Sequence, residues 1–134
     1  MAALTQDRDT QQREGIDFEY PVAANAKIYA GSIVNRNSSG YAKPGSDTAS
    51  EVFLGIAQEQ VDNAGGANGA KSVVVRRKGV FELAASGMAI TDIGAAVYVS
   101  DDQTVAKTTT NSVACGKIAG FRSATSVWVD IDQR

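Results

Sequence analysis

The chain contains one small β-strand module twice, and this repetition restricts the folds that it can adopt. Each copy has four short segments in the same order. They span 28–34, 40–43, 54–57 and 72–75 in the first copy, and 90–97, 104–107, 116–119 and 126–129 in the second. Two copies are too few for a solenoid, which needs about three stacked repeats. The sequence therefore predicts an all-β fold, a small barrel or sandwich built from two related β-modules.

Turn-forming residues separate the predicted strands at intervals of roughly ten residues, the spacing of all-β sandwiches and barrels. These turns span 37–40, 44–47, 62–66, 86–87 and 101–102. At the C-terminal end Val127, Val129 and Ile131 alternate with polar residues, which predicts a strand with one buried face. Val73 and Val75 are the matching inward pair of the first copy. A short helical turn is expected at 91–94.

The 134 residues suit one domain. Residues 1–15 are polar and mixed in charge, so they predict a flexible, extended N-terminal arm, with a frayed terminus as the alternative. Residues 16–134 are expected to form a single β domain, with internal halves of about 16–85 and 86–134. No apolar run approaches the ~20 residues of a membrane span, and the N-terminus lacks the apolar core of a secretory signal. We therefore expect no membrane partner and synthesis in the cytoplasm.

The residue types argue against an enzyme. The chain has no histidine, so it lacks the commonest general base and metal ligand. Its single cysteine, Cys115, excludes an internal disulfide and predicts a buried thiol. A net charge of −2 argues against nucleic acid, which is bound through clustered cations. We expect no catalytic residues, no metal, no cofactor and no small-molecule substrate.

Residues 65–72 come close to a phosphate-binding loop but differ from it in two respects. Ala70 stands where that motif needs its second glycine, and the β-branched run 73–75 favours a strand where the motif requires a helix. The segment is interpreted as a hairpin loop.

Contacts to a protein partner are predicted at aromatic and basic positions. Trp128 is out of phase with Val127 and Val129, which favours an interface anchor over the alternative, a core position. The basic cluster 76–78 fits a solvated strand end, with contact to an acidic protein surface as the alternative. The candidate contact residues are Arg8, Arg13, Tyr20, Tyr29, Arg76, Arg77 and Trp128.

Several segments, taken in order, resemble the head decoration proteins, or capsid cement proteins, of tailed bacteriophages and prophages. The resemblance covers nearly the whole chain. Each segment is low in chemical specificity, so the match rests on the order of the segments. The segments are Arg8-Asp9-Thr10, Phe18-Glu19-Tyr20-Pro21-Val22-Ala23-Ala24, Lys27-Ile28-Tyr29-Ala30-Gly31, Gly40-Tyr41-Ala42, Gln58-Glu59-Gln60-Val61-Asp62-Asn63, Arg77-Lys78-Gly79-Val80-Phe81 and Asp101-Asp102-Gln103-Thr104-Val105-Ala106.

The resemblance implies a β-rich structural virion protein on the outer surface of a phage capsid. Such a protein bridges neighbouring major capsid proteins and associates with itself as a dimer or trimer. The candidate contact residues would then face the capsid or a second copy. The alternative is a binding module displayed on the virion that recognises a glycan or protein of the host surface.

Overall fold

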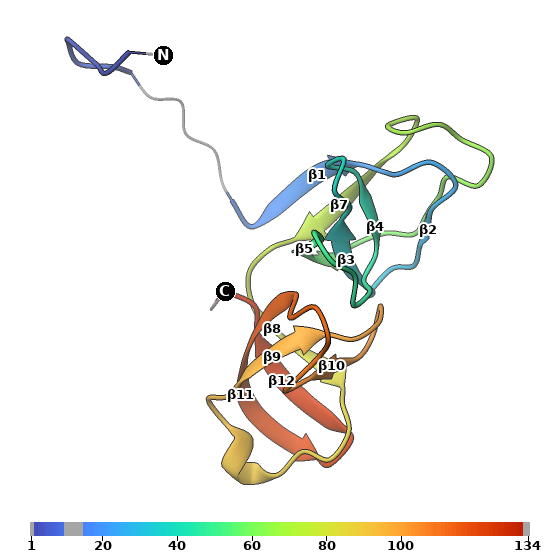
Figure 1. Cartoon of the computed structure of the whole chain (residues 1–134), viewed down its shortest axis with the longest axis vertical. Helices are drawn as coiled ribbons and strands as arrows, with labels where there is room; N and C mark the ends of the chain where they lie inside the picture. Colours follow the sequence, from blue (N-terminus) through green and yellow to red (C-terminus); the bar gives the residue numbers. More distant parts are fainter. Residues whose placement is uncertain (1, 10–14, 133–134) are drawn as a thin grey trace.

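Two antiparallel sheets of five strands follow one another along the chain (Figure 1). The computed structural model describes residues 2–9 and 15–132. The first sheet contains β1 (Asp17–Pro21), β3 (Ile33–Arg36), β4 (Ala42–Pro44), β5 (Val52–Ala57) and β7 (Ser72–Arg76). The second contains β8 (Val80–Ala84), β9 (Ala96–Val99), β10 (Val105–Ala106), β11 (Ala114–Ser123) and β12 (Ser126–Asp130). A small ribbon of β2 (Lys27–Ile28) and β6 (Val61–Asp62) accompanies the first sheet, and a 3-10 turn, η1 (Ile90–Asp92), precedes β9.

The second sheet repeats the first strand by strand. The orders are β1-β7-β5-β3-β4 and β8-β12-β11-β9-β10, so each strand has an equivalent in the other half. An isolated parallel bridge joins Val22 to Ala42 in the first half, and a second one joins Ala84 to Thr104 in the other. Each sheet is thereby curled until its two edge strands meet, as in a small barrel. The predicted all-β fold of two related modules is confirmed.

Glycines at equivalent places allow two strands of each module to approach closely. Gly55 of β5 lies against the carbonyl oxygen of Arg76, and Gly116 of β11 lies against that of Asp130. A Cβ atom at either glycine would collide with that oxygen. Because backbone atoms cannot give way as a flexible side chain can, the module needs glycine at this point in both copies.

The division between the modules falls earlier than the sequence analysis placed it. The first sheet ends at Arg76, and β8, within the expected first half of about 16–85, pairs with β12 of the second sheet. The register explains the assignment. Phe81 lies opposite Val129 as Phe18 lies opposite Val75, so β8 is the repeat of β1.

The smaller of two apolar cores lies inside the first module. It comprises Val22, Ile28, Val34, Ala42, Ala57, Val61, Val73 and Val75. Of these, Val73 and Val75 are fully buried, as their alternation predicted.

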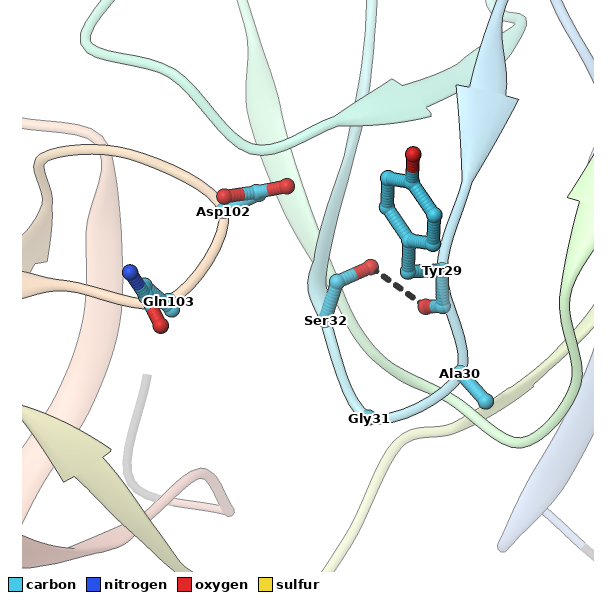
Figure 2. Close-up of a pocket in the computed structure, with 6 residues that line it drawn as sticks. All are labelled: Tyr29, Ala30, Gly31, Ser32, Asp102 and Gln103. Carbon is cyan, nitrogen blue, oxygen red and sulfur yellow. Dashed lines mark hydrogen bonds between the residues drawn. The ribbon is translucent and has the colours of Figure 1, made fainter.

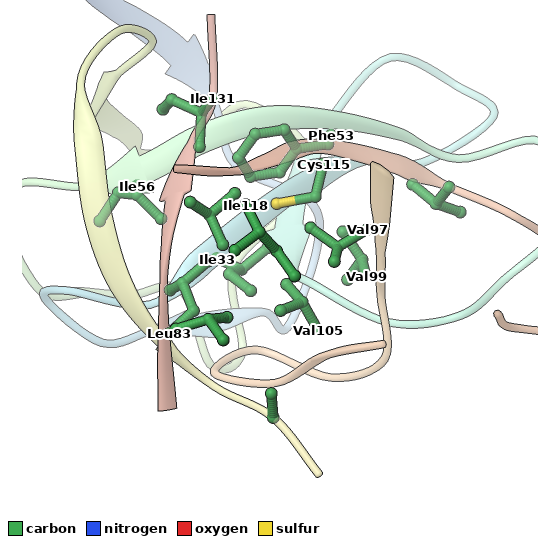
Figure 3. Close-up of a cluster of buried hydrophobic side chains, with 14 of the residues drawn as sticks. Ile33, Phe53, Ile56, Leu83, Val97, Val99, Val105, Cys115, Ile118 and Ile131 are labelled. Atoms are coloured by element: carbon green, nitrogen blue, oxygen red, sulfur yellow. The ribbon is translucent and has the colours of Figure 1, made fainter. Parts of the chain in front are cut away.

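The larger core belongs to the second module but includes three residues of the first. Ile33, Phe53 and Ile56 of β3 and β5 pack with Cys115 and Ile118 (Figure 3). The burial of Cys115 confirms the sequence prediction for this thiol.

The shared core exists because two residues of the first module differ from their equivalents in the second. By register, Ile33 and Ile56 correspond to Ala96 and Lys117 of the second module. Ala96 and Lys117 are exposed, whereas Ile33 and Ile56 are buried. Burial of large aliphatic side chains stabilises by about 1.5–3 kcal/mol each. The outer face of β3 and β5 has therefore become the apolar contact between the modules.

Hydrogen bonds close the junction on both sides. The backbone N–H of Ile33 donates to the carbonyl oxygen of Asp102 at 2.7 Å. The Asp47 carboxylate accepts from the backbone N–H groups of Thr110 and Asn111 at 3.0 and 2.9 Å. The amide of Asn111 donates to the Asp47 carbonyl oxygen at 3.0 Å. The two modules are thus joined by packing and by backbone contacts.

We predict that the modules unfold together, because neither can lose the other without exposing the shared core. Ile56→Ala should lower the free energy of unfolding by about 2–5 kcal/mol. The matched change at the equivalent exposed site, Lys117→Ala, should alter it by less than about 0.5 kcal/mol. Urea unfolding is followed by circular dichroism for both modules and by fluorescence of the single tryptophan for the second. The two curves should coincide in the wild type and in both variants, and separated midpoints would contradict this prediction.

Candidate functional site

Trp128 stands on the outer face of β12, as its phase predicted. Its side chain is 42% exposed, while Val127 and Val129 on either side are fully buried. In the sheet Trp128 lies between Gly120 of β11 and Glu82 of β8. The ring rests on Gly120, where a Cβ atom would lie 3.3 Å from Trp128 Cδ1. An aromatic side chain over a strand glycine is held in place without being buried.

The surroundings of Trp128 combine apolar groups with paired charges. The Arg122 guanidinium forms an ion pair with the Glu82 carboxylate across β12. Val80, on the same side of β8 as Glu82, is 50% exposed. We call this surface, made by Val80, Glu82, Gly120, Arg122 and Trp128, the Trp128 face. An aromatic centre bordered by polar groups is the usual anatomy of a protein–protein interface.

The first module does not need an aromatic residue at the equivalent position. Val74 of β7 lies opposite Glu19 as Trp128 lies opposite Glu82. Val74 is half-buried, and its N–H donates to the Glu59 carboxylate at 3.2 Å. The same strand arrangement therefore forms with a smaller, aliphatic side chain at this position.

A second apolar feature lies at η1, which packs beside β11. Ile90 and Ile93 are 66% and 49% exposed. The Asp92 carboxylate holds this turn, because it accepts from the Ala89 N–H at 2.8 Å and from Lys107 Nζ at 3.1 Å. The hydrogen bond from Ala89, followed by that from Lys107, lowers the pKa of Asp92 below its usual value. The helical turn was predicted, but the exposure of its two isoleucines was not.

The basic strand end of β7 is engaged within the module. Arg76 pairs with the Asp17 carboxylate through two hydrogen bonds of 2.9 and 3.2 Å. The hydrogen bond from Arg76, reinforced by its charge, lowers the pKa of Asp17. The Arg77 guanidinium lies 5.7 Å from the centre of the Phe18 ring. Tyr20, 5.5 Å from Phe18 between ring centres, packs against the first core.

The other predicted contact residues lie elsewhere. Tyr29 is 52% exposed and lies in the turn between β2 and β3. Arg8 is exposed in the described stretch 2–9, and Arg13 lies outside the described residues. The structure therefore places Trp128, the group around Arg76, and Tyr29 on three separate parts of the chain. Their contact roles stay predictions.

Residues 65–71 form a loop that leads into strand β7, as expected from Ala70 and the β-branched run. The loop is not the predicted hairpin, because β6 before it pairs with β2 while β7 after it pairs with β1 and β5. Among residues 2–9 and 15–132 there is no group of three histidine, cysteine, aspartate or glutamate residues placed to hold a metal ion. Within the same described ranges, no helix has the length and apolar character needed to cross a membrane.

The fold is an all-β pair of repeated modules with an exposed aromatic face. The family model of phage cement proteins matches residues 11–131, and the chain belongs to that family. The family is one of structural phage proteins that stabilise the capsid, so the protein binds phage capsid proteins and is located in the virion capsid. No curated protein and no solved structure matches the chain.

We predict that acid loosens the η1 turn. A carboxyl with a lowered pKa stabilises the fold above its unfolded value of 3.8, and this stabilisation is lost as the pH falls through the folded pKa. Asp92→Asn should therefore show a smaller loss of unfolding free energy between neutral pH and pH ~3 than the wild type. The measurement is urea unfolding at both pH values, with Asp132→Asn as the exposed control. Equal acid sensitivity of Asp92→Asn and the wild type would contradict the role of Asp92.

Proposed function

We propose that this protein binds the outer surface of an assembled phage head and bridges neighbouring major capsid proteins. The observation that carries the proposal is the match to the phage cement family over residues 11–131. The Trp128 face supports it, because a half-exposed tryptophan bordered by polar groups is the kind of side chain that anchors protein–protein interfaces. We propose no catalytic activity, in keeping with a structural role.

The junction between the modules suits a bridge. A bridge stabilises two capsid proteins only if its own parts do not separate under load. Here Ile33, Phe53 and Ile56 tie the modules through a common core. Force applied to one module is therefore transmitted to the other through packed side chains.

We propose that the protein also associates with itself, as a dimer or trimer. The contacts with the capsid and between copies are assigned to the Trp128 face and to the remaining candidates. These are Arg8, Arg13, Tyr20, Tyr29, Arg76 and Arg77. Many linked contacts on a lattice gain avidity, so that each one can be modest. With a net charge of −2, the chain has no general attraction to nucleic acid or to anionic membranes.

The arm is proposed to add a second contact to each docked copy. Leu4 is its one large apolar side chain in the described stretch, and it is exposed. Arg8 adds a cation and Asp7 and Asp9 add anions, all exposed. Ordering such a segment costs about 1–2 kcal/mol per residue in backbone entropy. Contacts of the arm are favourable only once the domain has docked and made them intramolecular.

We expect the protein to be present on purified heads in a fixed proportion to the major capsid protein, as measured by quantitative mass spectrometry. Trp128→Ala should reduce rebinding to stripped heads by about 30-fold or more, because a buried tryptophan anchor contributes about 2 kcal/mol or more. Val52→Ala, which shortens an exposed apolar side chain outside the Trp128 face, is the control and should rebind normally.

One result would contradict the proposal as a whole, and another would contradict its assignment of the Trp128 face. One is the absence of the protein from purified heads. The other is equal rebinding of Trp128→Ala and the wild type when both have the same thermal midpoint, which would remove the Trp128 face from the contact while leaving the family role intact.

We predict that deletion of residues 2–14 leaves the domain folded and weakens its occupancy on heads. The strands of the described residues begin at Asp17, so the circular dichroism spectrum and the thermal midpoint should change little. Decorated heads should then break at lower temperature or after milder osmotic shock. A second variant keeps the full length of the arm but replaces Asp7, Arg8 and Asp9 with serine. It tests whether the charges of the arm, and not only its presence, are needed for occupancy. Equal occupancy of the deletion and the wild type would reduce the arm to a terminus without function.

A further inference from the structure

We propose that the hollow between the two modules binds a saccharide. It has a volume of about 290 Å³ and is lined by Tyr29, Ala30, Gly31, Ser32, Asp102 and Gln103 (Figure 2). This size is near the lower end of the range of about 300–1,000 Å³ for small-molecule sites. The first four residues come from the turn before β3 and the last two from the turn before β10. The site therefore exists only where the modules meet.

Both walls of the hollow are held in place by hydrogen bonds within their turns and, for the first wall, to β5. On one side the Ser32 hydroxyl donates to the Tyr29 carbonyl oxygen at 2.7 Å, and the Gly31 N–H donates to the Ala57 carbonyl oxygen at 2.8 Å. On the other side the Gln103 N–H donates to Asp101 Oδ1 at 2.9 Å.

The two walls are also fastened to each other and to β8. The Ile33 N–H donates to the Asp102 carbonyl oxygen at 2.7 Å, and the Ala84 N–H donates to the Gln103 carbonyl oxygen at 3.0 Å. A ligand in the hollow would meet walls that are already ordered, which reduces the entropy lost on binding.

Three polar side-chain groups in the hollow have no hydrogen-bond partner among the described residues. They are the Tyr29 hydroxyl, the Asp102 carboxylate and the Gln103 amide. The carboxylate only accepts hydrogen bonds, while the amide and the hydroxyl both donate and accept. Beside them the Tyr29 ring offers an apolar surface that is half-exposed. A ligand must therefore pack on one aromatic surface and also form several closely spaced hydrogen bonds, as a donor and as an acceptor.

A pyranose ring meets these requirements. Its C–H groups form an apolar face that can pack on Tyr29. Its adjacent hydroxyls can donate to the Asp102 carboxylate and exchange hydrogen bonds with the Gln103 amide. The combination of an apolar contact with a few convergent polar groups is the general design of a small-molecule site.

Charged ligands fit this hollow less well. Lys27 Nζ lies 5.1 Å from the centre of the Tyr29 ring, so a cation placed on that ring would be repelled by the ammonium. A phosphate would be repelled by the Asp102 carboxylate. A neutral, hydroxyl-rich ligand avoids both penalties. The shallow site predicts millimolar affinity for one sugar, which becomes effective when many copies are displayed together.

The test is a titration of the full chain with glucose, galactose, N-acetylglucosamine and rhamnose, followed by amide chemical shifts. At least one sugar should shift residues 29–32 and 101–104 with a millimolar Kd. Tyr29→Ala and Asp102→Asn should each weaken that binding by about tenfold or more. Gln103→Ala, which removes the amide from the second wall, should also weaken it. Trp128→Ala removes an exposed aromatic group elsewhere and should leave the sugar affinity unchanged.

The proposal is overturned if none of the four sugars shifts these residues at tens of millimolar in the folded protein. It is equally overturned if the shifts persist unchanged in Tyr29→Ala and Asp102→Asn, because binding would then lie outside the hollow. A larger response to N-acetyl-arginine amide than to every sugar would reassign the hollow to a cationic side chain of a protein partner.

Discussion

The insertion of Ile33, Phe53 and Ile56 into the core of the second module is the contact on which the rest of the structure depends. Each module alone is a five-stranded sheet closed by a single parallel bridge. A unit of roughly 60 residues buries a smaller fraction of its surface on folding than a larger domain does, and its stability is correspondingly marginal. The shared core makes them one body and sets the distance between the Trp128 face and the first module. It also brings the turns at Tyr29 and Asp102 together, so that the hollow depends on the same contact.

Much of the fold could be predicted from the sequence because the module is repeated. Periodic turns, the alternation around Val127 and Val129, and the order of segments were enough to predict an all-β fold of two related halves. The sequence did not show that β8 belongs to the second sheet. β8 resembles β1 only at core-facing positions such as Phe81 and Phe18, while the residues around them differ. The shared core was missed for a related reason. Ile33 and Ile56 look like ordinary strand residues until the register of the two sheets shows that they correspond to the exposed Ala96 and Lys117.

The candidate site could be predicted only where strand phase determines exposure. Trp128 lies out of phase with two buried valines, and the structure exposes it. Charge gave less information. Arg76 and Arg77 were expected at a solvated strand end, with contact to an acidic protein surface as the alternative, and the structure pairs Arg76 with Asp17 and places Arg77 over the Phe18 ring. Asp102 and Gln103 carry no signal of their own, since a turn rich in polar residues is expected in any β protein. Their role near Tyr29 arises from contacts between distant parts of the chain.

The central claim is that a rigid pair of modules joins neighbouring capsid proteins through the Trp128 face. A cryo-electron microscopy reconstruction of decorated heads, at a resolution that shows side chains, tests it most directly. The account predicts density for both modules on the outer surface, with the same relative placement as in the free protein and with Trp128 buried against a major capsid protein. Contact with only one capsid subunit, or a Trp128 face turned toward solvent while another surface makes the contact, would contradict it.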